Sequence, residues 1–212
     1  MNLLVTAGPT REFLDEVRYL SNLSSGRMGH AIAAAAAGAG HAVTLVSGPV
    51  ELPAPAGVER VEVESASEML SALRARWGGA EALVMAAAVA DFRPALRMPG
   101  KMKKAGEARA MVELVRTPDI LLELSRDKGS RILIGFALET DGLLAEASRK
   151  MAQKSLDAVV ANSIENLGSE RASATVLTPD GQARPWTDLP KAQFGARLVA
   201  LLGELSAARR GA

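Results

Sequence analysis

The sequence predicts an α/β fold: a Rossmann-like, doubly wound and mainly parallel sheet with helices on both faces. Short apolar runs alternate with longer segments of helical pattern, which is the order of repeated β-α-β units. Polar, glycine-marked segments directly follow several apolar runs, as loops at the carboxyl ends of parallel strands do. With 212 residues, 48% of them hydrophobic, the chain suits a single domain over residues 1–212.

The expected elements follow from apolar spacing and from helix-start signals. Ser65 and Glu68 form a capping-box pattern before one helix, and Thr117-Pro118-Asp119 is typical of a cap, a first helical proline and an acidic first turn. Residues 9–23 have no regular pattern. The expected strands are 3–6, 42–46, 58–63, 82–86, 132–134 and 158–160, and the expected helices are 26–39, 65–77, 142–155 and 189–208.

Two segments interrupt this alternation. Residues 93–112 are basic and lack an apolar stripe, and Gly100 and Gly106 flank the lysines, so we expect a mobile lid. Residues 174–187 indicate two strands joined by a turn at Pro179-Asp180-Gly181. We expect this second segment to project from the sheet as a hairpin arm that serves dimerisation.

Composition excludes several classes of function. The net charge of +1 favours neither nucleic acid nor a membrane surface, and no apolar run approaches a membrane span. The absence of cysteine excludes thiolate catalysis and disulfides. His30 and His41 lie in apolar surroundings and are expected to be structural, which disfavours a Ser-His-Asp mechanism. Without a basic leader at the start, a cytoplasmic location is expected.

The strongest local candidate for phosphate binding is Ser24-Ser25-Gly26, which opens a helix whose free N–H groups favour an anion. A capped helix start with glycines for packing explains the same residues equally well. Asn22 lies just before it and could donate to an oxyanion, although a lone loop asparagine is more often a turn residue.

Lysine is much rarer than arginine in this chain, yet Lys101, Lys103 and Lys104 cluster within the basic segment. A compact, movable ammonium suits a phosphate whose charge changes, whereas a solvated charged face is the alternative. Lys150 and Lys154 are four residues apart and share a helix face, with an anion between them or solvent around them.

Familiar nucleotide motifs are absent. The chain has no G-x-G-x-x-G after its first strand and no G-x-x-x-x-G-K-[ST], which disfavours an ordinary dinucleotide site and excludes a P-loop. The single tyrosine, Tyr19, has no lysine four residues later, so a Tyr-x-x-x-Lys reductase pair is impossible.

Taken together, the polar segments resemble those of bacterial phosphopantothenate–cysteine ligases, and the resemblance covers nearly the whole chain. Arg27 stands where lysine is common, and Met102 lies inside the lysine motif. The segments that carry the resemblance are Thr6 to Glu12, Arg18 to Gly29, Ser47-Gly48-Pro49, Ala86 to Pro94, Lys101 to Lys104, Pro118-Asp119-Ile120, Gly135 to Thr140 and Ala161-Asn162.

The resemblance implies a ligase of coenzyme A biosynthesis that joins 4′-phosphopantothenate to L-cysteine. CTP is cleaved to CMP and pyrophosphate through an acyl-cytidylate, with Mg²⁺ bridging phosphates and without flavin in this chain. The family implies a homodimer. Its bacterial members are often fused to a flavin-dependent decarboxylase, so association with a phosphopantothenoylcysteine decarboxylase is a possible partnership.

The resemblance and the local patterns together define the expected site. Asn22 and Lys101 are expected to be catalytic, no dedicated metal ligand is expected, and Asn22, Arg18, Ala88 and Asn162 are expected to bind substrate. The expected nucleotide-binding residues are Gly8, Ser24, Ser25, Gly26, Met85, Ala86, Ala87, Asp91, Lys101, Pro118, Asp119, Ile120, Phe136, Lys150 and Lys154.

Two alternatives belong to other classes. A nucleotide-binding regulator without catalysis would keep the glycine-marked loops but would not need Asn22 together with the lysine cluster. An NAD(P)-dependent reductase on the same type of sheet is disfavoured by the missing motifs. The nucleotide that stabilises the protein against heat would separate these possibilities.

Overall fold

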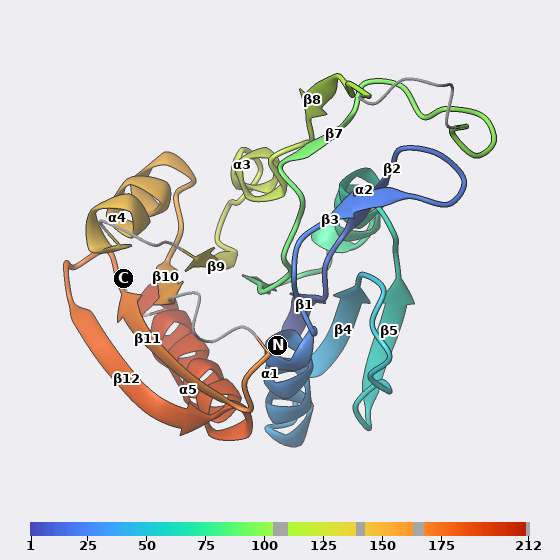
Figure 1. Ribbon diagram of the computed structural model, residues 1–212. Coiled ribbons are helices and arrows are strands. Elements are labelled where there is room, and N and C mark those ends of the chain that lie inside the picture. The colour runs from blue at the N-terminus through green and yellow to red at the C-terminus, as the bar shows by residue number, and fades with distance from the viewer. Residues whose placement is uncertain (104–109, 139–142, 163–167, 211–212) are drawn as a thin grey trace.

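The computed structural model describes residues 1–103, 110–138, 143–162 and 168–210, and it confirms the predicted α/β class. An eight-stranded sheet has the order β12-β11-β10-β9-β6-β1-β4-β5, and its six strands from β10 to β5 are parallel (Figure 1). These parallel strands are β1 (Asn2–Ala7), β4 (Ala42–Ser47), β5 (Val58–Glu62), β6 (Ala82–Met85), β9 (Ile132–Leu138) and β10 (Ala158–Asn162).

The helices cover both faces of this sheet, and each face has its own core. Alternate side chains of β1 point to opposite sides, so Leu3 and Val5 join one core while Leu4 joins the other. Phe194 and Leu198 of helix α5 (Lys191–Arg210) pack in the first core, and Met69 and Leu73 of helix α2 (Ala66–Trp77) pack in the second. Helices α1 (Arg27–Gly38) and α5 cover one face, and α2, α3 (Ile120–Ser125) and α4 (Leu143–Gln153) cover the other.

The 174–187 segment does not project from the sheet, so that prediction was wrong. Strands β11 (Arg171–Leu177) and β12 (Ala183–Pro190) extend the sheet, because β11 pairs antiparallel with β10. The physical reason is an apolar face: Trp186 is buried and its ring lies 4.9 Å from the ring of Phe194. A hairpin with such a face gains more by closing the core than by extending into solvent.

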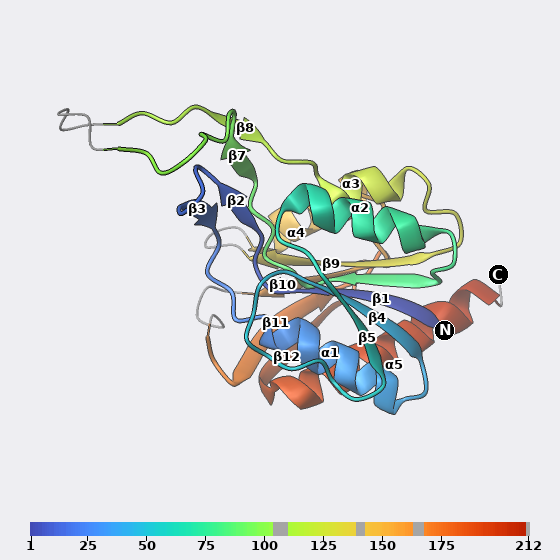
Figure 2. The same cartoon turned by 90° about the vertical axis from the view of Figure 1, so that its right-hand side faces the viewer.

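The segment that does project is the basic one. Strands β7 (Phe92–Pro94) and β8 (Leu114–Arg116) pair antiparallel, and the described residues between them, 95–103 and 110–113, extend away from the body (Figure 2). Residues 104–109, which include Lys104, lie outside the described residues. Residues 9–23 are more regular than expected, because they contain the hairpin β2 (Arg11–Phe13) and β3 (Tyr19–Ser21).

Helix α3 begins later than predicted. Its cap is Asp119, whose Oδ1 accepts a hydrogen bond from the N–H of Leu122 at 3.1 Å. Thr117 and Pro118 therefore precede the helix, because the hydroxyl of Thr117 donates instead to the carbonyl of Ala90 at 2.6 Å. The capping box before α2 is partly confirmed: Ser65 accepts from Glu68 N–H, whereas the Glu68 carboxylate accepts from the N–H of Glu64.

The described helices include none with the length and apolar character that crossing a membrane requires. In Figure 2 the N-terminus lies on the far side of the sheet from β2, β3, β7 and β8. Both hairpins therefore lie beyond the carboxyl ends of the parallel strands, where open α/β sheets bind their ligands.

Candidate functional site

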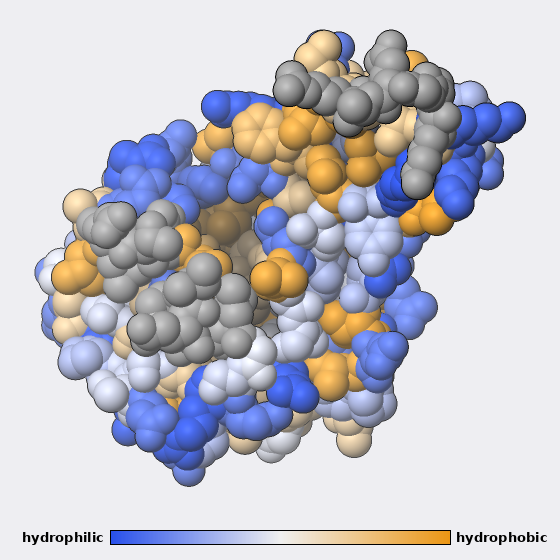
Figure 3. Space-filling view, in the orientation of Figure 1, coloured by the Kyte–Doolittle hydropathy of each residue, from blue (hydrophilic) through white to orange (hydrophobic). Residues whose placement is uncertain are grey.

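The strand order places a crevice between β1 and β6. In chain order the parallel strands lie 3-2-1-4-5-6 across the sheet, so successive connections turn in opposite directions on either side of β1 and β6. Such a switch point leaves room for a ligand beyond the strand ends. Two adjoining cavities lie there, and Figure 3 shows the surface hollowed in this region.

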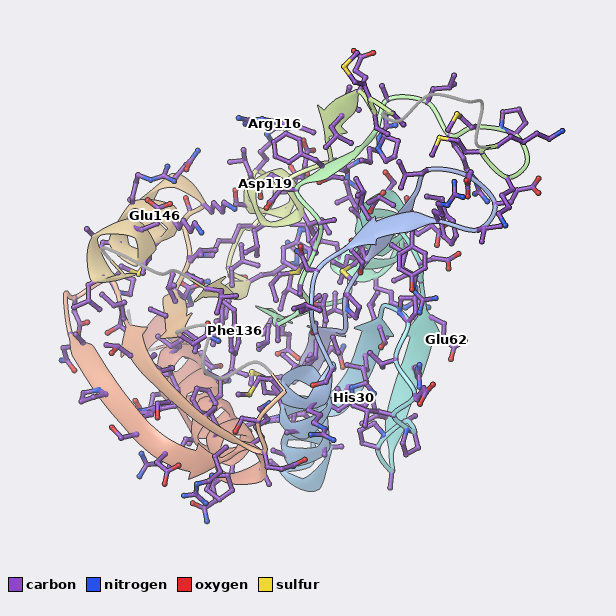
Figure 4. The ribbon with its side chains drawn as sticks, in the orientation of Figure 1. His30, Glu62, Arg116, Asp119, Phe136 and Glu146 are labelled. Atoms are coloured by element: carbon purple, nitrogen blue, oxygen red, sulfur yellow. The ribbon has the colours of Figure 1, made fainter. Side chains whose placement is uncertain are left out.

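The first cavity has a volume of about 450 Å³ and lies between α3, α4 and the ends of β6 and β9. Figure 4 shows Phe136, near the end of β9, below Asp119 at the start of α3. Gly135 makes up part of the floor, where an added Cβ would lie 2.9 Å from Leu156 Cδ1. The predicted nucleotide-binding residues that line this cavity are Met85, Ala87, Asp91, Pro118, Asp119, Ile120, Phe136, Lys150 and Lys154.

The second cavity has a volume of about 500 Å³ and extends from β9 and β10 to the start of α1. It therefore combines the predicted helix N-terminus with the predicted substrate-binding residues. The expected site residues that line it are Asn22, Ser24, Ser25, Gly26, Ala86, Ala87, Ala88, Asp91, Phe136 and Asn162.

Four residues line both cavities and form the shared wall: Ala87, Val89, Asp91 and Phe136. Two ligands could therefore meet at this wall. Reacting groups that are held side by side gain rate through proximity and orientation.

Buried threonines hold the connection that follows β6 and carries most of the shared wall. Thr6 accepts a hydrogen bond from the N–H of Ala87, and Thr10 accepts one from the N–H of Ala90, both at 3.0 Å. Both threonine side chains are fully buried, so these bonds are shielded from water. Both lie in the Thr6 to Glu12 segment that carries the family resemblance, but sequence analysis placed neither among the candidate site residues.

The charges of the first cavity are partly paired. Lys154 Nζ lies 2.8 Å from Asp119 Oδ2, so the anion that faces this lysine is the capping residue of α3. Lys150 and Asp91 line the same cavity. Arg116, at the end of β8, is a further cation on its wall that sequence analysis did not identify.

The amides of the second cavity have different partners. Asn22 Nδ2 donates to the carbonyl of Val89 at 2.9 Å, which links the loop before α1 to the shared wall. Asn162 Oδ1 is buried and has no hydrogen-bond partner among the described residues. A buried, unpaired acceptor on a cavity wall is suited to a ligand N–H.

Three expected residues line neither cavity: Gly8, Arg18 and Lys101. Gly8 lies behind the site with φ of 74°, and its carbonyl accepts from the N–H of Ala88 at 2.9 Å. An added Cβ on Gly8 would meet the carbonyl oxygen of Gly48 at 3.0 Å, so its role in this structure is to support the loop.

Arg18 and the start of the basic segment meet at Asp15 instead. Asp15 accepts from the N–H of Met102 at 3.0 Å, and Arg18 Nη1 lies 3.2 Å from its carboxylate. The bond from Met102 is the largest of the effects that hold the pKa of Asp15 below its usual range. The β2–β3 hairpin therefore anchors the basic segment just beyond Lys101, which is exposed.

Lys191 and Arg27 also line the second cavity, and sequence analysis assigned neither to the site. Lys191 begins α5, far away in the sequence, so no local motif identified it. Arg27 was visible as a basic residue just after Ser24-Ser25-Gly26.

The fold and the two cavities are typical of the class of α/β proteins that bind ligands at the switch point of a parallel sheet. Residues 1–205 match the family described as DNA/pantothenate metabolism flavoprotein C-terminal domain, and the chain belongs to that family.

Curated relatives agree with this assignment. The chain is 43% identical over 187 residues to the coenzyme A biosynthesis bifunctional protein CoaBC of Vibrio vulnificus (strain YJ016), covering 85% of this chain and 47% of that protein. It is 38% identical over 210 residues to the CoaBC of Bacillus subtilis (strain 168), covering 97% and 52%. The chain thus spans about half the length of the curated relatives it matches.

A solved structure supports the same fold. The crystal structure of the C-terminal domain of a CoaBC protein superposes with a TM-score of 0.84 at 36% identity, covering 96% of this chain and 94% of that one. A structure of a Cab2 mutant in complex with phosphopantothenate-cysteine has a TM-score of 0.80 at 16% identity, and it shows the fold alone.

Proposed function

We propose that this protein joins 4′-phosphopantothenate to L-cysteine, with cleavage of CTP, as a step of coenzyme A biosynthesis. The bifunctional relatives are named for coenzyme A biosynthesis, and this chain is similar to about half of each. The observation that carries the proposal is the pair of adjoining cavities with a shared wall, because a two-substrate ligation needs its reacting groups side by side.

The proposed reaction has two steps. In the first, a carboxylate oxygen of phosphopantothenate attacks the α-phosphorus of CTP, and the bond to the β-phosphate oxygen breaks to release pyrophosphate. In the second, the cysteine amine attacks the acyl carbon, loses a proton, and CMP leaves with the bonding electron pair. The shared wall is where the carboxylate and the α-phosphate would meet.

The first cavity is the proposed nucleotide site. It has the start of α3, Lys150 of α4 and Lys154 just after that helix, and it holds most of the expected nucleotide-binding residues. Lys154 would exchange Asp119 for phosphate oxygens when the nucleotide binds, because the lysine lies at the cavity wall. Backbone groups near Ala86-Ala87 and Phe136 are the proposed contacts to the cytosine base, and a hydrogen-bonding site can reject the wrong base strongly.

Mg²⁺ is proposed to bind with the nucleotide. Among the residues that the structure describes, no three acidic or histidine side chains come together as a metal cage. Both carboxylate oxygens of Asp119 have partners, Leu122 N–H and Lys154, which leaves Asp91 as the carboxylate of the first cavity without a side-chain partner among the described residues. The residues present fit a Mg²⁺ ion that is held mainly by phosphates, where it would neutralise charge on the departing pyrophosphate.

The direct test measures pyrophosphate release with CTP and 4′-phosphopantothenate, with and without cysteine. We expect release in both cases and ligated product only with cysteine. Replacing CTP with ATP should lower kcat/KM substantially, and equal values for both nucleotides would contradict the proposed base selection. Thermal stabilisation by NADPH alone, without pyrophosphate release, would favour a reductase, and stabilisation by a nucleotide without turnover would favour a regulator.

Association with a decarboxylase is part of the proposal, because the curated relatives are bifunctional proteins about twice as long as the matched region. Size-exclusion chromatography with a separately produced phosphopantothenoylcysteine decarboxylase would test it. We expect the decarboxylase to elute together with this protein, and separate elution of the two proteins would contradict the proposed association.

A further inference from the structure

Thr117, which precedes helix α3, makes two hydrogen bonds to the segment that follows β6. Its hydroxyl donates to the carbonyl of Ala90 at 2.6 Å, and its backbone N–H donates to the carbonyl of Asp91 at 3.0 Å. One residue thus holds two successive carbonyls, and these lie on either side of the Asp91 Cα. The backbone conformation of Asp91 is restrained as a result.

The hydroxyl of Thr117 is available for this contact because helix α3 has another cap. Asp119 accepts a hydrogen bond from the N–H of Leu122 at 3.1 Å and so satisfies the start of the helix. A threonine beside a helix start commonly has that role itself. Here the threonine serves the cavity wall instead.

The same segment is held from the opposite side by the loop after β1. Thr10 is fully buried and accepts from the N–H of Ala90 at 3.0 Å, and Ala90 is buried as well. Thr10 also hydrogen-bonds the buried carboxylate of Glu12, which accepts from the N–H of Ala66 at the start of α2 at 2.8 Å. Because these bonds are shielded from water, the backbone before Asp91 is held firmly between α2 and α3.

Asp91 lines both cavities, and its side chain has no hydrogen-bond or ion-pair partner among the described residues. The place of this carboxylate on the shared wall therefore depends on the backbone bonds around it. Mg²⁺ requires nearly ideal octahedral geometry of its ligands, so a carboxylate that meets this ion must be well placed.

We propose that Thr117 is a positioning residue, whose two hydrogen bonds hold Asp91 where its carboxylate can meet the Mg²⁺ that arrives with the nucleotide. This inference rests on the proposed function and adds to it a residue that acts through Asp91. Thr117 also lines the first cavity, so the test must separate an effect through Asp91 from a direct contact with the nucleotide.

The test measures the affinity of the full chain for CTP by calorimetry, once with Mg²⁺ and once with EDTA. Thr117→Val keeps the size of the side chain and the backbone N–H but removes the hydroxyl. It should weaken CTP binding in Mg²⁺ by roughly 3- to 10-fold, as expected for loss of one buried hydrogen bond. In EDTA the change should stay below about twofold, because the role of Asp91 needs the ion. Thr117→Ser, which restores a hydroxyl, should recover most of the affinity.

A double-mutant cycle shows whether Thr117 acts through Asp91. On the Asp91→Asn background, Thr117→Val should change CTP affinity in Mg²⁺ by less than about twofold, because the carboxylate that it positions is gone. If Thr117→Val does not fold, Thr117→Ala replaces it in the cycle, because the smaller side chain leaves room for water at the Ala90 carbonyl.

Thr44→Val is the matched control. Thr44, in β4, also donates a hydrogen bond from its hydroxyl, to Glu59 at 2.8 Å, and it lines neither cavity. The substitution is the same in kind and should leave CTP affinity unchanged with Mg²⁺ and with EDTA.

The inference is overturned if Thr117→Val binds CTP as the wild type does, if it loses as much affinity in EDTA as in Mg²⁺, or if the two substitutions are additive in the cycle. Failure of the proposed function gives a different result. In that case Thr117 would still affect CTP binding through Asp91, while the wild type would release no pyrophosphate from CTP and 4′-phosphopantothenate.

Discussion

At the scale of single residues, Asn22 connects the loop before α1 to the shared wall. Its amide donates to the carbonyl of Val89, and it lines the second cavity beside Gly26 and Ala88. An amide nitrogen has a second hydrogen, which can reach a developing oxyanion when the cysteine amine attacks.

We predict that Asn22→Asp separates the two half-reactions. The variant should bind CTP and release some pyrophosphate, but its rate of product formation should fall by about 10²–10³, because one oxyanion donor is lost. Single-turnover measurement of pyrophosphate and product checks this. A variant that forms product at nearly the wild-type rate would show that Asn22 only shapes the loop.

His30 predicts how stability depends on pH. Its Nδ1 lies 3.1 Å from the carbonyl of Gly26, and its Nε2 is buried without a partner among the described residues. Protonation would leave a buried N–H unpaired, and burial is the main cause that lowers the pKa of His30, with Arg60 adding to it. The unfolded chain takes up this proton near pH 6.5 and the folded chain only at lower pH, so acid favours unfolding.

The free energy of unfolding should therefore decrease as pH falls from 7 towards 5, and His30→Phe should reduce that decrease. His41 also has a lowered pKa, so His41→Asn should reduce it separately. Urea unfolding at several pH values measures both effects. An unchanged pH slope in the His30 variant would contradict the assignment.

At the scale of elements, glycines set how closely α1 and α5 approach their neighbours. A Cβ on Gly29 would lie 2.5 Å from the Cβ of Ala7, so α1 packs directly on β1. A Cβ on Gly195 would lie 2.7 Å from the carbonyl oxygen of Ala31, so α5 packs directly on α1. Gly203, on the same helix α5, has no atom within 4 Å of such a Cβ.

We predict opposite effects for two substitutions on α5. Gly203→Ala should stabilise the protein by up to about 1 kcal/mol, because alanine is the better helix former. Gly195→Ala gains the same propensity but forces α5 away from α1, and overpacking typically costs about 1–3 kcal/mol. Chemical denaturation of the two variants measures both changes in the free energy of unfolding, and their difference reports the close contact between α5 and α1. Equal stabilisation by the two substitutions would contradict that contact.

At the scale of the whole molecule, the described part of the basic segment, residues 93–103 and 110–112, lies beyond the site on the β7–β8 extension (Figure 2). Lys101 is exposed and lines neither cavity, so its proposed catalytic role requires movement of this segment. The hydrogen bond from the N–H of Met102 to Asp15 would hold one end of the moving segment to the β2–β3 hairpin. Closure would exclude water from an acyl-cytidylate that hydrolysis would destroy.

We therefore predict that CTP increases the hydrogen-exchange protection of the 93–112 segment. Lys101→Gln should lower kcat more than it raises KM, because its contact matters most as phosphate charge develops. Equal protection with and without CTP, or a variant with only a modestly higher KM, would contradict closure.

The extension also carries a proposed dimer contact. Its exposed apolar side chains are Phe92, Leu96, Met111, Val112 and Leu114, and the 174–187 hairpin that was expected to serve this role belongs to the sheet. We predict a homodimer by light scattering at micromolar concentration, and Met111→Asp with Leu96→Asp should shift it towards monomer. Leu23→Asp, at an exposed leucine elsewhere, is the control.

The sequence by itself determined the α/β class, most element positions and most of the candidate site. Apolar periodicity is local, and residues at the ends of parallel strands converge whenever such strands pair, so Asn22, Asp91, Phe136 and Asn162 could be placed together. Tertiary structure decided the rest. It placed the apolar hairpin against β10 and α5, paired Lys154 with Asp119, and brought Lys191 to a cavity opposite residues far away in the chain. These outcomes depend on which apolar surfaces are buried against each other. Such burial is decided when elements far apart in the sequence pack together, so local sequence patterns do not predict it.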